Sequence, residues 1–193
     1  MPHTDAKTML AQALRDALQT VPLSKVTVSG LTRTAGVTRQ AFYYHFADIH
    51  DLTVWVFKRE VADHIIAHST HADWADGLLS MFTWMRDHPE ETRSVIASLS
   101  MEDLQIFLYK QLRAVMEPIV DHYSDGLTVH ADDHEFVTEH FTLSVLGHVC
   151  QWLTTDMSAD PTILTDRIAR VLNGQVRRSL ELFASSPQAS TRA

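Results

Sequence analysis

The chain has 193 residues, of which 45% are apolar and 21% charged, and its net charge is −8. These shares are typical of a globular protein and exclude a wholly disordered chain. Six glycines and six prolines are few for a β-sandwich or β-barrel. No apolar run approaches the ~18–20 residues of a membrane-spanning helix, and the N-terminus lacks a signal-peptide profile. Cys150 is the one cysteine and cannot form an internal disulfide, so we expect a cytoplasmic protein without a membrane partner.

The charge is unevenly distributed along the chain. Residues 1–47 hold five basic and two acidic side chains, a net of +3, so the remaining residues carry a net of −11. A basic N-terminal segment on an acidic body indicates an anion-binding module despite the negative total. An ordinary fluctuation of charge in a short window explains the same numbers equally well.

The apolar residues repeat with helical spacing throughout, which predicts an all-α chain of about nine helices. A first helix ends near Pro22, a second runs from a cap at Thr27 to Thr34, and a third covers residues 39–45. A long fourth helix follows Asp48, and the others are expected at 73–88, from there to about 99, and at 101–124, 134–155 and 161–184. Pro118 should bend the helix at 101–124 or split off its last turn.

We divide the chain into a helix-turn-helix domain at 1–47, a helical body at 48–184 and a disordered tail at 185–193. The last two helices are apolar on more sides than one core requires, which predicts a four-helix interface between two copies of the chain. We assign Val145, Val149, Trp152, Ile168, Leu172, Val176 and Leu180 to this interface. Close helix approach would explain Gly147 and Gly174. The alternative is that both helices belong to the core of a monomer.

The most informative segment is 26–57. Its pattern is a short helix, a turn at Gly36, a second short helix capped by Thr38, and a long helix, which is helix-turn-helix geometry. The apolar residues form a small core and leave six side chains outward: Thr38, Arg39, Gln40, Tyr43, Tyr44 and His45. Arg and Gln can bind guanine and adenine edges through two hydrogen bonds, and hydroxyl groups suit phosphates. The alternative is an ordinary helical hairpin.

The segment resembles the DNA-binding domain of the tetracycline-repressor (TetR/AcrR) family of one-component regulators. The resemblance rests on Ala35-Gly36-Val37, Thr38, Arg39-Gln40, Phe42-Tyr43 and Phe46. The sequence RQAFYYHF is similar to that of a subgroup related to regulators of dihydroxyacetone-kinase operons. The resemblance implies a nine-helix subunit that dimerises through its last two helices. It also implies binding to a palindromic operator in double-stranded DNA and an effector site in the body.

The resemblance assigns a role to each matched residue. Arg39 and Gln40 would face bases. Thr38, Tyr43, Tyr44 and His45 would contact phosphates, and Thr27 caps the second helix where the family often places another phosphate contact.

Two positions depart from the family pattern. Ile49 stands where a phosphate-binding lysine is usual, and Ala41 stands where threonine is common. We therefore expect either a weaker DNA affinity or more phosphate binding by Lys25, Arg33 and Lys7.

Residues 74–123 are rich in methionine and tryptophan, which can shape a pliable apolar pocket. We assign the effector pocket to Trp84, Met85, Met101, Phe107 and Tyr123. The effector is either a small molecule or a protein coregulator.

The twelve histidines leave a second class of function open, a helical-bundle enzyme or metal-binding protein. His64, His68 and His71 share helical spacing, as do His130 and His134. Neither set repeats a zinc-binding pattern or supplies a third and fourth ligand. We expect no metal, no cofactor and no catalytic residue.

Overall fold

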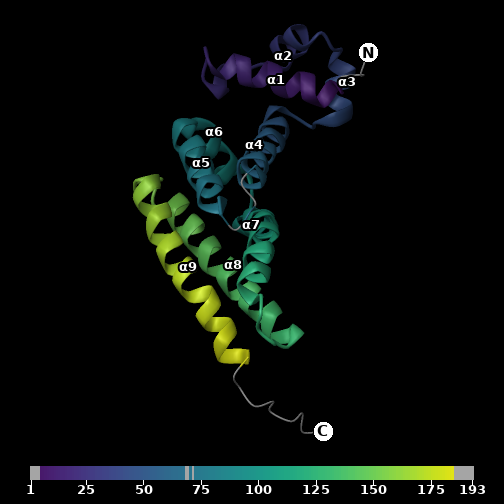
Figure 1. Cartoon of the computed structure of the whole chain (residues 1–193). Coiled ribbons are helices and arrows are strands. Elements are labelled where there is room, and N and C mark those ends of the chain that lie inside the picture. Colours follow the sequence, from purple (N-terminus) through teal and green to yellow (C-terminus); the bar gives the residue numbers. More distant parts are fainter. Residues whose placement is uncertain (1–4, 68–69, 71, 185–193) are drawn as a thin grey trace. The chain divides into compact units, whose positions relative to one another are not determined.

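The computed structural model describes residues 5–67, 70 and 72–184. Within these ranges the chain forms nine α-helices, one short 3-10 helix and no strand (Figure 1). The helices are α1 (Ala6–Leu18), η1 (Leu23–Lys25), α2 (Val28–Ala35), α3 (Arg39–His45), α4 (Ile49–Ile66), α5 (Trp74–Asp87), α6 (Pro89–Ser98), α7 (Met101–Ser124), α8 (Ala131–Thr154) and α9 (Pro161–Ala184). The predicted all-α fold is confirmed.

Helix α8 starts earlier than predicted, whereas helix α7 has the predicted bounds. Helix α8 begins at Ala131, three residues early, because the ring of His130 accepts a hydrogen bond from the backbone N–H of Asp132 at 3.3 Å and caps the helix. Helix α7 continues past Pro118 to Ser124, so this proline does not split off the last turn.

The described chain divides into two compact units. The first unit comprises Met1–Val61 and Met85–Leu104, and the second comprises Ala62–Trp84 and Gln105–Ala193. Helix α6 therefore belongs with the N-terminal helices. The functional division at residue 47 stays a prediction.

The core of the first unit joins α1, α2, α3 and the start of α4. Leu10, Leu14, Phe42 and Leu52 are completely buried in it, and Phe46 is nearly so. Burial of one such side chain contributes about 1.5–3 kcal/mol. The cluster can therefore hold the seven-residue helix α3, which is too short to be stable alone.

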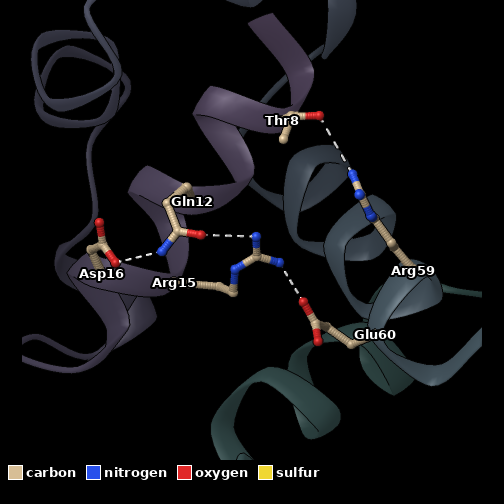
Figure 2. Close-up of polar contacts among 6 residues, drawn as sticks. All are labelled: Thr8, Gln12, Arg15, Asp16, Arg59 and Glu60. Atoms are coloured by element: carbon tan, nitrogen blue, oxygen red, sulfur yellow. Dashed lines mark hydrogen bonds and ion pairs between the residues drawn. The ribbon is translucent and has the colours of Figure 1, made fainter. Parts of the chain in front are cut away.

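Polar contacts also hold α1 along α4 (Figure 2). Arg15 forms an ion pair with Glu60, and a second nitrogen of its guanidinium donates to Gln12 Oε1 at 3.1 Å. Arg59 of α4 donates to Thr8 Oγ1 at 3.5 Å. These contacts fix the position of α1 along α4 and engage Arg15 within the protein.

The second unit contains α8 and α9, which lie side by side (Figure 1). Trp152 of α8 packs against Phe82 of α5, with 4.7 Å between ring centroids. Its Nε1 donates to the carbonyl of Ala159 at 2.8 Å. Trp152 thereby fixes the connection that leads into α9.

Arg177 of α9 closes the end of α7. Its Nη1 donates to the carbonyls of Tyr123 at 3.1 Å and Asp125 at 3.0 Å, and its Nε donates to Glu181 Oε1 at 3.0 Å. Carbonyls at a helix end lack partners within the helix. Arg177 therefore supplies donors that the backbone of α7 cannot.

Candidate nucleic-acid interface

A tight turn joins α2 to α3. Gly36 adopts a left-handed conformation with φ of 67°, which a residue without Cβ takes at little cost. The N–H of Val37 donates to the carbonyl of Thr32 at 3.0 Å, and Thr38 Oγ1 then accepts from the N–H of Ala41 at 3.0 Å. The glycine turn and the threonine cap are thus both formed, and together they place α3 after α2 as in a helix-turn-helix pair.

Helix α3 has a buried side and an exposed side. Phe42 is completely buried, whereas Tyr43 is 52% and Tyr44 84% exposed, and Arg39 and Gln40 are also exposed. Exposure of two large aromatic rings gives up apolar burial that would stabilise the fold. The exposed face of this helix carries side chains that can bind bases and side chains that can bind phosphates.

Three further predicted contacts lie beside α3. His45 is half-buried, and its ring lies 4.9 Å from that of Tyr44, between centroids. Thr27 Oγ1 accepts from the N–H of Gly30 at 3.1 Å and caps α2. Its hydroxyl hydrogen is not used in that bond and can still be donated to a phosphate. Lys25, in η1, is exposed.

Tyr43 also lines a groove of about 820 Å³ in the first unit. The other walls are residues 22–24, Val26, Val28, residues 47–50 and the side chains of Glu90, Arg93 and Ser94 from α6. Ser94 Oγ lies 3.4 Å from His50 Nδ1. No sequence pattern indicates this groove, because segments far apart in the chain form it.

The effector pocket assigned to five residues stays a prediction. Met85 is completely buried and Met101 is 41% exposed in the first unit, while Trp84, Phe107 and Tyr123 are half-buried in the second. A cavity of about 20 Å³ in the second unit is lined by other side chains: Ile65, Trp74, Leu78, Leu112, Val115, Met116, Ile119 and Val145.

The seven side chains assigned to a dimer interface lie inside a single chain. Each of Val145, Val149, Trp152, Ile168, Leu172, Val176 and Leu180 is at most 6% exposed. They pack α8 and α9 into the core of the second unit and offer almost no surface to a second copy. The outer faces of the same helices carry exposed apolar side chains instead, including Phe136, Leu143, Ile163, Val171 and Leu182.

Two of the histidines that share helical spacing contact other side chains. His64 Nδ1 lies 2.9 Å from Ser80 Oγ, and His134 Nε2 lies 3.1 Å from Asp121 Oδ1. His68 and His71 lie outside the described residues. Among the described residues, no group of three or more His, Cys, Asp or Glu side chains could hold a metal ion. Across the same residues, none of the helices combines the length and the hydropathy that a membrane crossing needs.

Comparison with known families identifies the chain. Residues 72–174, more than half of its length, match a TetR-type family model described as a transcriptional regulator C-terminal region. The chain belongs to the TetR family of transcriptional regulators. It is a DNA-binding transcriptional regulator, as the helix-turn-helix motif predicts.

Relatives of this TetR-family regulator agree in sequence and fold. The dhaKLM operon transcriptional activator DhaS of Lactococcus lactis subsp. lactis (strain IL1403) is 28% identical over 80 residues, which span 42% of this chain and 43% of that protein. The structure of the dihydroxyacetone kinase operon activator DhaS has a TM-score of 0.65, with 17% identity over 92% of this chain and 97% of that one. The TetR-family repressor AlkX of Dietzia sp. strain DQ12-45-1b has a TM-score of 0.54, with 14% identity over 91% and 98%.

Proposed function

We propose that this TetR-family regulator binds a palindromic operator as a homodimer, with α3 of each copy in the major groove. The observation that carries this proposal is the exposed face of α3, on which Arg39, Gln40, Tyr43 and Tyr44 are exposed while Phe42 is buried. Arg39 and Gln40 stand at the N-terminal end of the helix, which meets base edges in helix-turn-helix complexes. The tyrosine hydroxyls suit phosphates.

Selection of bound fragments from random duplex DNA by the purified protein tests this proposal. A palindrome among the sequenced products supports it. Recovery of fragments with no shared sequence would contradict it. The selected duplex then serves as the operator for the experiments below.

Three substitutions separate base contacts from phosphate contacts. Arg39→Ala should cost about 1–3 kcal/mol on the operator and flatten the preference at one base pair of each half-site. Tyr43→Phe should weaken operator and scrambled duplexes nearly equally, since a phosphate contact carries no base information. Lys25→Gln should lower the slope of log affinity against log salt by about one. A base preference altered by Tyr43→Phe and not by Arg39→Ala would refute this orientation of α3.

We infer that the homodimer forms through the outer faces of α8 and α9. One stripe of α8 carries Phe136 and Leu143, and one stripe of α9 carries Ile163 and Val171, all about half exposed or more. A groove of about 310 Å³ runs between the two helices. The same two stripes contain Gly147 and Gly174, and a methyl group added at either glycine would meet no neighbouring atom of the described chain within 4 Å. This open surface supports close approach of a second copy.

Sedimentation of charged variants tests the interface. Val171→Asp places a carboxylate in the proposed contact, where burial of an unpaired charge costs several kcal/mol, so the variant should sediment as a folded monomer. Asn173→Asp adds the same charge at an exposed position on another side of α9 and should leave the dimer intact. A monomeric wild-type protein at micromolar concentration, or a dimeric Val171→Asp variant, would refute the proposal.

We propose that the region matched by the family model, residues 72–174, senses an effector. Because the similar protein DhaS is an activator of a dihydroxyacetone kinase operon, dihydroxyacetone is the first compound to test. Calorimetric titration that shows stoichiometric binding would support a small-molecule effector and would count against a protein coregulator.

We infer that the chain acts by binding and not by catalysis, since the relatives described above are regulators. Metal analysis of the purified protein tests the alternative of a metal-binding bundle. One bound metal ion per chain would favour that alternative, and operator binding by metal-free protein would count against it.

A further inference from the structure

The ammonium of Lys7, in the first turn of α1, is held against two aromatic rings. Its Nζ lies 5.9 Å from the ring centroid of Phe46 and 5.9 Å from that of Trp55. Phe46 caps the C-terminal end of α3. The packing therefore brings a cation from the start of the chain to the end of the helix proposed to enter the DNA groove.

The contacts between α1 and α4 determine where Lys7 lies. The next residue, Thr8, accepts the hydrogen bond from Arg59 (Figure 2). The guanidinium of Arg59 lies 5.6 Å from the ring centroid of Trp55. Two turns further along α1, Arg15 pairs with Glu60. Both contacts fix α1 along α4. The fold therefore holds the backbone of Lys7 near Phe46, and the position of the ammonium does not depend on the flexible side chain alone.

The charge of Lys7 is available to a further anion. Within the described part of the chain, its ammonium forms no ion pair with a carboxylate, whereas Arg15 of the same helix is engaged by Glu60. Asp5, the neighbouring acid, accepts a hydrogen bond from the backbone N–H of Lys7 at 3.4 Å. An ammonium over a ring face keeps N–H donors for an oxygen acceptor on its other side.

We propose that Lys7 binds a backbone phosphate of the operator, a contact contributed by α1 from outside the helix-turn-helix pair. This inference rests on the proposed operator binding. A lysine that neutralises one phosphate contributes about 0.9 to the salt slope and carries no sequence information. Lys7 therefore supplies affinity at this end of α3, where the side chain of Ile49 packs partly buried against the core.

A salt titration of matched variants tests the contact. The full-length wild type, Lys7→Gln, Lys7→Arg and Lys110→Gln are titrated with the selected operator and with a scrambled duplex between 50 and 200 mM salt. Lys110 is an exposed lysine of α7 in the second unit, so its variant loses the same charge elsewhere. Lys7→Gln should weaken both duplexes by a similar factor and lower the slope by about 0.9, which makes its fold-loss about 3- to 4-fold larger at 50 mM than at 200 mM. Lys7→Arg and Lys110→Gln should keep the wild-type slope.

Lys7→Met separates charge from packing, because it keeps an unbranched stem against the two rings and removes the ammonium. A lowered slope for both Lys7→Gln and Lys7→Met supports the proposal. A wild-type slope in these variants overturns it, including the case in which affinity falls and the slope stays, since that result indicates a packing role. If the wild-type protein binds neither duplex, the proposed function fails and this inference fails with it. If the wild-type protein binds the operator and the Lys7 variants have the wild-type slope, this inference fails and the proposed function stands.

Discussion

Arg177 offers a direct test of how the second unit is held together. Its guanidinium donates to the carbonyls of Tyr123 at 3.1 Å and Asp125 at 3.0 Å, at the C-terminal end of α7. A hydrogen bond to a charged group contributes about 1.5–3 kcal/mol when the acceptor cannot be rehydrated. The side chain is 42% exposed, so water replaces part of the loss. We therefore expect Arg177→Ala to destabilise the protein by about 1–2 kcal/mol in total.

Thermal unfolding of the Arg177→Ala variant, compared with that of Arg178→Ala, measures this loss of stability. Arg178 is exposed on the same helix, and Arg178→Ala should change the free energy of unfolding by less than about 0.5 kcal/mol. For a chain of this size, the loss at Arg177 corresponds to a midpoint lower by about 3–6 °C. Arg177→Lys should recover part of it, since an ammonium can reach only part of this forked arrangement. Equal midpoints for Arg177→Ala and Arg178→Ala would refute the reasoning.

Three further outcomes are expected. Asp156 has φ of 54°, so Asp156→Val should be about 1–2 kcal/mol less stable than Asp156→Gly by urea unfolding, and equal stabilities would contradict a backbone origin. Burial raises the pKa of the Cys150 thiol, so its alkylation should be slower in the folded than in the urea-unfolded protein at pH 8 and should rise only at higher pH. The hydrogen bond from Arg113 at 2.7 Å lowers the pKa of Glu135. That carboxylate therefore stabilises the fold above its ordinary pKa of about 4.3 and loses the effect as pH falls through the lowered value, so the midpoints of wild type and Glu135→Gln should converge in acid.

The N-terminal part of the fold could be predicted because its signals are local. The glycine at position 36 and the threonine at position 38 each determine a backbone feature within four residues, and the structure shows both features. The apolar spacing around Phe42 then determines which side of α3 is buried. Local chemistry therefore predicts which side chains of α3 face outward.

Features built by distant segments could not be predicted in this way. The position of Lys7 against Phe46 and Trp55 depends on how α1 lies along α4. The groove beside Tyr43 depends on α6 joining the first unit. Aromatic and methionine content suggested an effector pocket around residues such as Met85, but composition gives no information on which of these side chains share a cavity.

The burial of α9 shows why apolar periodicity alone cannot assign a surface. A helix that is apolar on two sides has one stripe for its own subunit and one for a partner, and the two stripes look alike in sequence. In α9, the strongest stripe, which includes Leu172 and Val176, is buried in its own chain, whereas Val171 is 62% exposed. The core takes the more continuous stripe, since it must be covered along the whole helix. We propose that the weaker stripe, broken by glycine and charged residues, contacts a second copy, since an interface must also tolerate water before the dimer forms.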